Sequence, residues 1–122
     1  MIGLEIHAQI TALKSKLFCS CRGNYRDLKP NTNICDTCCG LPGTLPIINR
    51  KAIEYSTMIS IALGCKIPNK IMFYRKNYFY PDLPKNFQIT QYNVYGFSSI
   101  GAEGMFELDD SKKIRITRIQ LE

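Results

Sequence analysis

The chain lacks tryptophan, has a single histidine and contains no long apolar run. No stretch approaches the roughly 18 consecutive apolar residues of a membrane-spanning helix, and no charged and then apolar leader opens the sequence. A length of 122 residues predicts one small domain with one core. We therefore expect a cytoplasmic protein, or the mature form of an organellar one, with no membrane partner.

Acidic residues are few. The chain has ten Asp and Glu residues and 16 Lys and Arg residues, which gives a net charge of +6. This excess suits a polyanionic partner such as RNA, although many modestly basic domains are merely well solvated. Charge by itself therefore leaves nucleic-acid binding open.

The one histidine lies in a segment that alternates strictly between polar and apolar residues, Gly-Leu-Glu-Ile-His-Ala-Gln-Ile at 3–10. As a strand, it places Glu5, His7 and Gln9 on one face, with neighbouring polar side chains about 7 Å apart. A carboxylate and an imidazole at that spacing are able to share a metal ion, a phosphate or a proton. A solvated outer face of an antiparallel strand has the same pattern, and the pattern alone favours it.

Five of the six cysteines gather between residues 19 and 39. Cys19 and Cys21 form one close pair, and Cys35 and Cys38 form another after a loop rich in turn-forming residues. Two close pairs joined by such a loop are typical of a tetrahedral zinc site, with a knuckle at each pair. Reduced thiols without a metal and two disulfides are the alternatives, but nothing else in the sequence suggests secretion. We expect structural zinc at these four residues.

A helix with clear ends is predicted just after this cluster. Asn49 is a suitable N-cap and Gly64 a suitable C′ residue. Cys65, which follows the helix, is expected to be a buried apolar thiol outside the metal site. The apolar stripe expected to face the core consists of Ala52, Tyr55, Ile59, Ala62 and Leu63.

Residues 71–92 interleave aromatic and basic side chains, with five aromatic residues before Pro81. Such a mixture is able to stack a base and hold phosphates. An edge strand followed by a proline-pinned turn has the same composition, and the pattern alone favours it. Further on, 109–111 (Asp-Asp-Ser) predicts a β-hairpin between Met105–Leu108 and Lys113–Glu122. In the second strand Arg118, Gln120 and Glu122 share one face.

Six ordered blocks resemble the B subunit of the tRNA-dependent aspartyl/glutamyl amidotransferases over nearly the whole chain. The archaeal E subunit shares the opening block, but the later blocks are more similar to the B type. The blocks are 2–7 (Ile-Gly-Leu-Glu-Ile-His), 14–19 (Lys-Ser-Lys-Leu-Phe-Cys), 30–33 (Pro-Asn-Thr-Asn), 40–46 (Gly-Leu-Pro-Gly-Thr-Leu-Pro), 75–85 (Arg-Lys-Asn-Tyr-Phe-Tyr-Pro-Asp-Leu-Pro-Lys) and 116–122 (Ile-Thr-Arg-Ile-Gln-Leu-Glu).

The resemblance implies a ligase subunit that forms a carbon–nitrogen bond. Such a subunit uses ATP and Mg²⁺ to phosphorylate the side-chain carboxylate of Glu misacylated onto tRNA(Gln), or of Asp on tRNA(Asn). Ammonia, which the A subunit releases from glutamine, then displaces the phosphate to give Gln-tRNA or Asn-tRNA. The implied partners are the A and C subunits and misacylated tRNA. The implied cofactors are Mg²⁺ and structural Zn²⁺, with ATP as a substrate.

The implied fold is α+β: an antiparallel sheet with packed helices, part of a cradle like that of glutamine synthetase, with a zinc-knuckle insertion at about 19–39. Glu5, His7 and Glu122 take the catalytic and magnesium-binding positions and are expected to converge on one pocket. By the same resemblance, the zinc knuckle of Cys19, Cys21, Cys35 and Cys38 is expected to support or contact the tRNA acceptor end. The candidate phosphate or substrate contacts are Arg75, Lys76, Asn77, Tyr80, Asp82, Lys85 and Arg118.

This chain departs from the family pattern in two positions, because the family commonly has Asp in place of Tyr74 and His in place of Gln120. The family also continues past the Leu-Glu block with the rest of the cradle, a helical domain and a tRNA-binding tail. We therefore expect the N-terminal part of a catalytic domain, inactive alone. A stand-alone zinc-stabilised RNA-binding module and a non-catalytic remnant that docks onto an A subunit are the alternatives. Specificity for Asp-tRNA or Glu-tRNA stays open.

Overall fold

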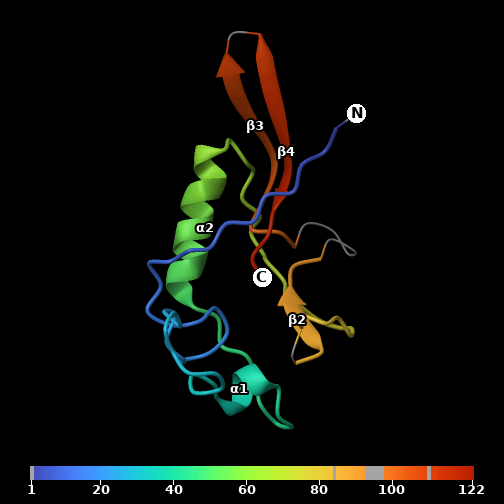
Figure 1. Cartoon of the computed structure of the whole chain (residues 1–122). Coiled ribbons are helices and arrows are strands. Elements are labelled where there is room, and N and C mark those ends of the chain that lie inside the picture. Colours follow the sequence, from blue (N-terminus) through green and yellow to red (C-terminus); the bar gives the residue numbers. More distant parts are fainter. Residues whose placement is uncertain (1, 84, 93–97, 110) are drawn as a thin grey trace. The chain divides into compact units, whose positions relative to one another are not determined.

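The computed structural model describes residues 2–83, 85–92, 98–109 and 111–122. Where the sequence predicts one core, the chain divides into two compact units, Met1–Ala52 and Ile53–Glu122 (Figure 1). None of the helices in the described ranges is long and apolar enough to cross a membrane.

The first unit opens with an irregular segment, and the strand predicted at 3–10 is wrong for the described chain. Leu4 is 86% exposed and Ile6 is 85% exposed, so the apolar face of the segment is not covered. A strand needs a neighbouring backbone to accept and donate its hydrogen bonds. No described segment pairs with residues 2–10, and the alternation of the sequence by itself does not supply that partner.

Little apolar burial holds the first unit together. Its regular structure is limited to α1 (Asp36–Cys39), the start of α2 and an isolated antiparallel bridge between Ser15 and Arg22. Among its described residues, Ala52 is the only hydrophobic residue that is fully buried. A unit of this size without a core needs another source of stability, such as a metal or disulfides.

Helix α2 (Arg50–Ala62) begins and ends as its sequence predicts. The Asn49 side-chain oxygen accepts a hydrogen bond of 2.9 Å from the Lys51 amide, as an N-cap does. At the other end Gly64 adopts a left-handed φ of 65°. The Gly64 amide donates to Ile61 O and the Cys65 amide to Ser60 O, which is the Schellman arrangement.

The buried face of α2 differs from the predicted apolar stripe. Ser56 and Ser60 are buried, whereas Ile59 is 45% exposed and Ala62 is also exposed. Small side chains are required on this face because a strand approaches it closely: a Cβ atom added at Gly101 would lie 2.5 Å from Ser60 Oγ. The sequence pattern therefore places the helix correctly and its packed face only in part.

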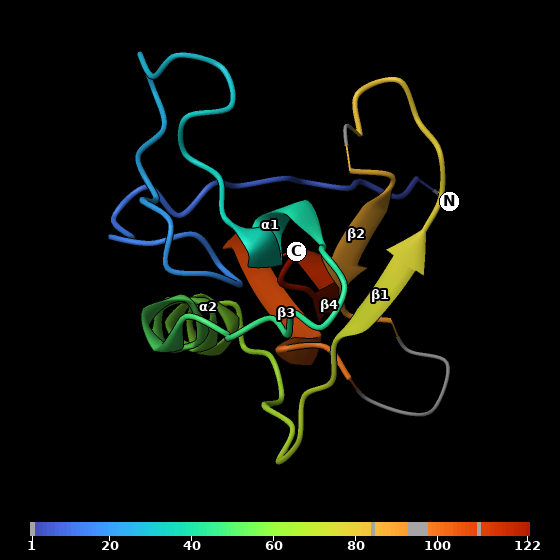
Figure 2. The ribbon, with the colours of Figure 1, turned by 90° about the horizontal axis from the view of Figure 1, so that it is seen from below.

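The second unit contains two separate antiparallel pairs of strands (Figure 2). β1 (Tyr74–Asn77) pairs with β2 (Phe87–Thr90), and β3 (Gly101–Asp109) pairs with β4 (Lys112–Ile119). The predicted hairpin around 109–111 is confirmed, with β3 beginning earlier than expected and β4 ending at Ile119, before the expected Glu122. Asp109 Oδ1 accepts hydrogen bonds from the backbone amides of Ser111 and Lys112 and from the Ser111 hydroxyl. These bonds, with that of the Ser111 hydroxyl first, lower the pKa of Asp109.

The α+β class is confirmed, with antiparallel strands and few helices. The buried hydrophobic residues of the second unit are Cys65, Phe87, Ile100, Ala102 and Leu121. Cys65 is therefore the buried thiol that the sequence predicts, and burial raises its pKa. The single cradle-shaped sheet stays a proposal, because the described strands form two pairs.

Gly104 provides a test of this packing. A Cβ atom at this position would lie 2.6 Å from Leu63 O and 2.4 Å from Cys65 Sγ. We expect Gly104→Ala to lower the free energy of unfolding by about 1–3 kcal/mol, because β3 must move away from the end of α2. Gly3→Ala is the matched control, since nothing lies within 4 Å of its added Cβ. Urea denaturation measures both variants, and equal stability would contradict the close approach.

Candidate functional site

Four cysteines of the first unit come together as the sequence predicts. The sulfur atoms of Cys19, Cys21, Cys35 and Cys38, here called the cysteine cluster, all lie within 4.8 Å of one another. A tetrahedral zinc ion with Zn–S bonds of about 2.3 Å needs sulfurs about 3.8 Å apart, so small side-chain adjustments suffice. Cys39 is exposed and outside the cluster. The donor set therefore fits zinc.

Local backbone structure sets the position of each pair. Around the first pair, the Lys16 amide donates to Cys21 O at 2.8 Å. The second pair lies at the start of α1, where the Cys35 amide donates to Cys38 Sγ at 3.1 Å. Gly40 ends this short helix with a left-handed φ of 71°. Local backbone turns therefore bring each pair of thiols together.

The thiols of the cysteine cluster do not ionise equally. A hydrogen bond from the Cys38 backbone, the largest cause, lowers the pKa of Cys35 to about 7. Burial, followed by hydrogen bonding with Cys35, raises the pKa of Cys21 to about 12. Burial also raises the pKa of Cys19. Without a cation Cys21 therefore stays protonated at neutral pH, and metal binding there must release its proton. Acidification consequently favours loss of metal.

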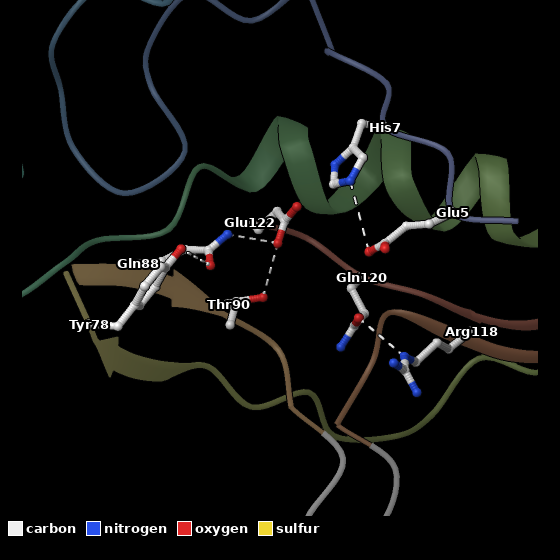
Figure 3. A network of polar contacts seen from close by, with 8 residues as sticks. All are labelled: Glu5, His7, Tyr78, Gln88, Thr90, Arg118, Gln120 and Glu122. Atoms are coloured by element: carbon white, nitrogen blue, oxygen red, sulfur yellow. Dashed lines mark hydrogen bonds and ion pairs between the residues drawn. The ribbon is translucent and has the colours of Figure 1, made fainter. Parts of the chain in front are cut away.

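Glu5 and His7 lie on one side of the opening segment, as the alternation predicts (Figure 3). His7 Nε2 is 3.8 Å from Glu5 Oε1, and the two side chains are 73% and 88% exposed. They belong to the first unit, whereas Glu122 belongs to the second. The convergence of these three residues on one pocket therefore stays a prediction.

Glu122 lies in a small polar network, here called the Glu122 cluster, that also includes Tyr78, Gln88 and Thr90 (Figure 3). Glu122 Oε2 accepts hydrogen bonds from Gln88 Nε2 at 2.8 Å and from Thr90 Oγ1 at 3.4 Å. The Tyr78 hydroxyl donates to Gln88 Oε1 at 3.3 Å. These contacts orient one carboxylate oxygen through two side chains of β2. Sequence reasoning identified Glu122 but missed Gln88 and Thr90.

A buried glutamine holds this part of the chain in place. Gln91 is 1% exposed, and its Oε1 accepts hydrogen bonds from the Ile100 amide at 3.0 Å and the Leu121 amide at 3.1 Å. The Gln91 backbone oxygen accepts a hydrogen bond from Gln120 Nε2. Within the described residues, Gln91 Nε2 has no partner. Nothing in the sequence pattern distinguishes Gln91, because it follows a strand as many solvated glutamines do.

The departures of this chain at positions 74 and 120 have local roles. Tyr74 begins β1 opposite Thr90, and its hydroxyl contacts Met72 Sδ at 4.0 Å. Gln120 donates to Gln91 as above, and its Oε1 accepts from Arg118 Nε at 3.2 Å. Gln120 thus connects Arg118, a candidate phosphate contact, to the backbone oxygen of Gln91.

The candidate cations of β1 lie on opposite faces of their hairpin. Lys76 is paired with Gln88, so it shares the face of the Glu122 cluster, whereas Arg75 is paired with Ile89 on the other face. Lys76 Nζ lies 4.8 Å from the centre of the Tyr78 ring. The alternation of side chains along β1 therefore separates Arg75 from Lys76, both of which are candidate phosphate contacts.

A second group of cations surrounds a buried ring. Arg75 lies 4.3 Å and Lys85 4.9 Å from the centre of Phe87, which is 4% exposed. Arg75 Nε also donates to Asn77 Oδ1 at 3.3 Å. Tyr80, which is 59% exposed, lies with Asp82 in the loop between β1 and β2. The ring restrains two long cationic side chains at one place on the hairpin.

Comparison with known proteins gives one consistent result. The family model described as "GatB/GatE catalytic domain" matches residues 1–122. The B subunits of aspartyl/glutamyl-tRNA(Asn/Gln) amidotransferases are similar over the same range. The relative from Saccharolobus solfataricus is 50% identical over 99% of this chain, and that from Thermus thermophilus 45% over 100%. The relative from Methanococcoides burtonii is 46% identical over 100%. The chain spans about a quarter of their lengths, at 25%, 25% and 26% respectively.

The bonds to Gln91 predict a large effect of removing its side-chain oxygen. Gln91→Leu leaves the Ile100 and Leu121 amides without their acceptor, and we expect a loss of about 2–4 kcal/mol in the free energy of unfolding. Gln9→Leu is the control, because Gln9 is exposed and its side chain donates only to Tyr25 among the described residues. Urea denaturation measures the stability of both variants. Equal midpoints for Gln91→Leu and Gln9→Leu would rule out this role of Gln91.

The geometry of the cysteine cluster predicts one zinc ion per chain. We expect Cys21→Ser to lose the metal, because three thiolates leave the tetrahedral shell open. Cys39→Ser and Cys65→Ala, which alter thiols outside the cluster, should keep a full zinc content. Elemental analysis of protein purified under reducing conditions measures all four proteins. A wild-type chain without zinc, or a Cys65→Ala variant that loses it, would contradict this assignment.

Proposed function

The chain belongs to the GatB/GatE catalytic domain family, and from this premise we propose that it provides part of the catalytic domain of the B subunit in a tRNA-dependent amidotransferase. The observation that carries the proposal is the match of the family model to all 122 residues. The Glu122 cluster adds support, since it holds an oriented carboxylate through Gln88 and Thr90, which lie on the same face of the β1–β2 hairpin as Lys76.

The proposed reaction has two steps. The side-chain carboxylate of Glu on tRNA(Gln), or of Asp on tRNA(Asn), attacks the γ-phosphorus of ATP, which gives an acyl phosphate and ADP. Ammonia then attacks the acyl carbon, inorganic phosphate leaves, and a proton is released as the amide forms. Phosphoryl transfer of this kind depends on positioning and on stabilisation of negative charge. Oxygen ligands and cations are therefore the side chains to assign.

We assign Glu5, His7 and Glu122 to hold Mg²⁺, which would neutralise phosphate charge when bound. Carboxylate oxygens suit this hard cation, and donors from distant parts of a chain are common in such sites. Lys76 suits the reacting phosphate, because alternation places it on the face of Glu122. Arg75 and Lys85 are positioned for a different anionic group, such as a phosphate of the tRNA backbone.

The other proposed residues have supporting roles. Asn77 positions Arg75, and Arg118 binds phosphate while it is held by Gln120. Tyr80 and Asp82 contact substrate from the exposed loop. Zinc at the cysteine cluster stabilises the first unit, which has little core, and supports the tRNA acceptor end. The A subunit would supply ammonia from glutamine, and the C subunit would join the complex.

A chimera tests the proposal directly. Residues 2–122 replace the matching segment of the Saccharolobus solfataricus relative, and the chimera is assembled with that organism's other subunits. We expect glutamine-dependent amidation of misacylated tRNA, with ADP formed only when that tRNA is present. In the chimera, Glu122→Gln and Glu5→Gln should lower the rate of ADP formation on the order of 100-fold while tRNA binding stays nearly intact, because each removes a charged oxygen ligand.

Glu107→Gln is the matched control, since Glu107 is an exposed glutamate of β3 that pairs with Lys113 at 2.6 Å. Its activity should equal that of the unmodified chimera. Equal losses of tRNA binding and chemistry in Glu122→Gln would instead indicate a structural role. A chimera that binds tRNA but forms no ADP would favour the RNA-binding module. One that assembles but neither binds nor reacts would favour the non-catalytic remnant.

A further inference from the structure

Lys16 connects the two halves of the cysteine cluster. Its backbone amide donates to Cys21 O at 2.8 Å, beside the first pair of thiols. Its Nζ donates to Asn33 O at 2.6 Å and lies 3.9 Å from Cys38 Sγ, in the second pair. One residue therefore contacts both sides of the loop that a metal would close.

The side chain of Lys16 is held in this position. It is half-buried, in contrast to the neighbouring Lys14, which is exposed. Within the described part of the chain, no carboxylate pairs with the Lys16 ammonium group. The strong hydrogen bond to the Asn33 carbonyl keeps the charge beside the sulfur atoms without neutralising it.

Four thiolates and one Zn²⁺ ion carry a net charge of −2, since the metal cancels only two of the four negative charges. A half-buried site with that charge is stabilised by a nearby cation, and hydrogen bonds to the sulfur ligands contribute as well. Arg22 and Lys29 are also near in sequence, but they are exposed and have no contact with a cluster sulfur among the described residues. Lys16 is thus the described cation placed to compensate this charge.

We propose that Lys16 is a positioning residue of the zinc site, which joins the two cysteine pairs and compensates the charge of the tetrathiolate. This inference rests on the proposed zinc site but not on amidotransferase activity. It predicts that the charge of residue 16 sets how tightly the metal is retained.

The test compares three variants of the chain. Lys16→Met keeps the length of the side chain and removes the charge, Lys16→Arg keeps the charge, and Lys14→Met is the matched control at an exposed position. Zinc affinity and the rate of zinc release are measured by competition with a chromogenic chelator at pH 7.5. We expect Lys16→Met to weaken zinc binding about 10- to 100-fold, as the loss of an outer hydrogen-bonding partner does. Lys14→Met should match the wild type, and Lys16→Arg should recover most of the loss.

The possible results separate the two proposals. A wild-type chain that binds no zinc overturns both the zinc site and the role of Lys16. A wild-type chain and a Lys16→Met variant with equal affinity and release rate overturn only the role of Lys16. Circular dichroism in excess zinc checks that each variant is folded. If Lys16→Met does not fold, Lys16→Arg is compared with the wild type and with Cys21→Ser. A zinc affinity of Lys16→Arg as low as that of Cys21→Ser would rule out charge compensation by residue 16.

Discussion

The second unit depends on a single neutral oxygen atom. Gln91 Oε1 accepts hydrogen bonds from the amides of Ile100 and Leu121. Ile100 lies just before β3, and Leu121 lies shortly after β4. Glutamine follows β2 directly, so three parts of the chain meet at one buried side chain. An amide oxygen is able to accept both hydrogen bonds without bringing a charge into the interior, as a carboxylate would. The position of Glu122, the residue after Leu121, follows from this arrangement.

The first unit has little apolar burial, but it offers four clustered thiols that fit a metal ion. Most of its described hydrophobic residues remain partly or fully exposed. The four thiols of the cysteine cluster lie close together in its loop. Metal binding in such a loop supplies the folding free energy that a small core does not. The raised pKa of Cys21 means that a proton competes with a metal for its sulfur, whereas the lowered pKa of Cys35 weakens that competition. Zinc bound at these sulfurs would therefore link the stability of this unit to pH.

Local signals in the sequence predicted the local structures. The N-cap and C′ residues predicted α2, and the two-pair spacing predicted the cysteine cluster. Features that depend on distant neighbours were not predictable in this way. The segment at 2–10 has a strand pattern but no described partner, and the packed face of α2 is set by the approach of Gly101. Gln91 and Lys16 look like ordinary polar residues until the chain brings their partners to them.

The contacts of Glu122 also suit the chemistry proposed for it. Gln88 and Thr90 are neutral donors, so they orient the carboxylate without cancelling its charge. A lysine or arginine in their place would compete with a divalent cation for the same oxygen. Lys76 lies on the same face and contacts the ring of Tyr78, and no acid of the described residues pairs with it. A carboxylate and a cation arranged in this way are able to act on a phosphate from two directions, which is what phosphoryl transfer to a carboxylate requires.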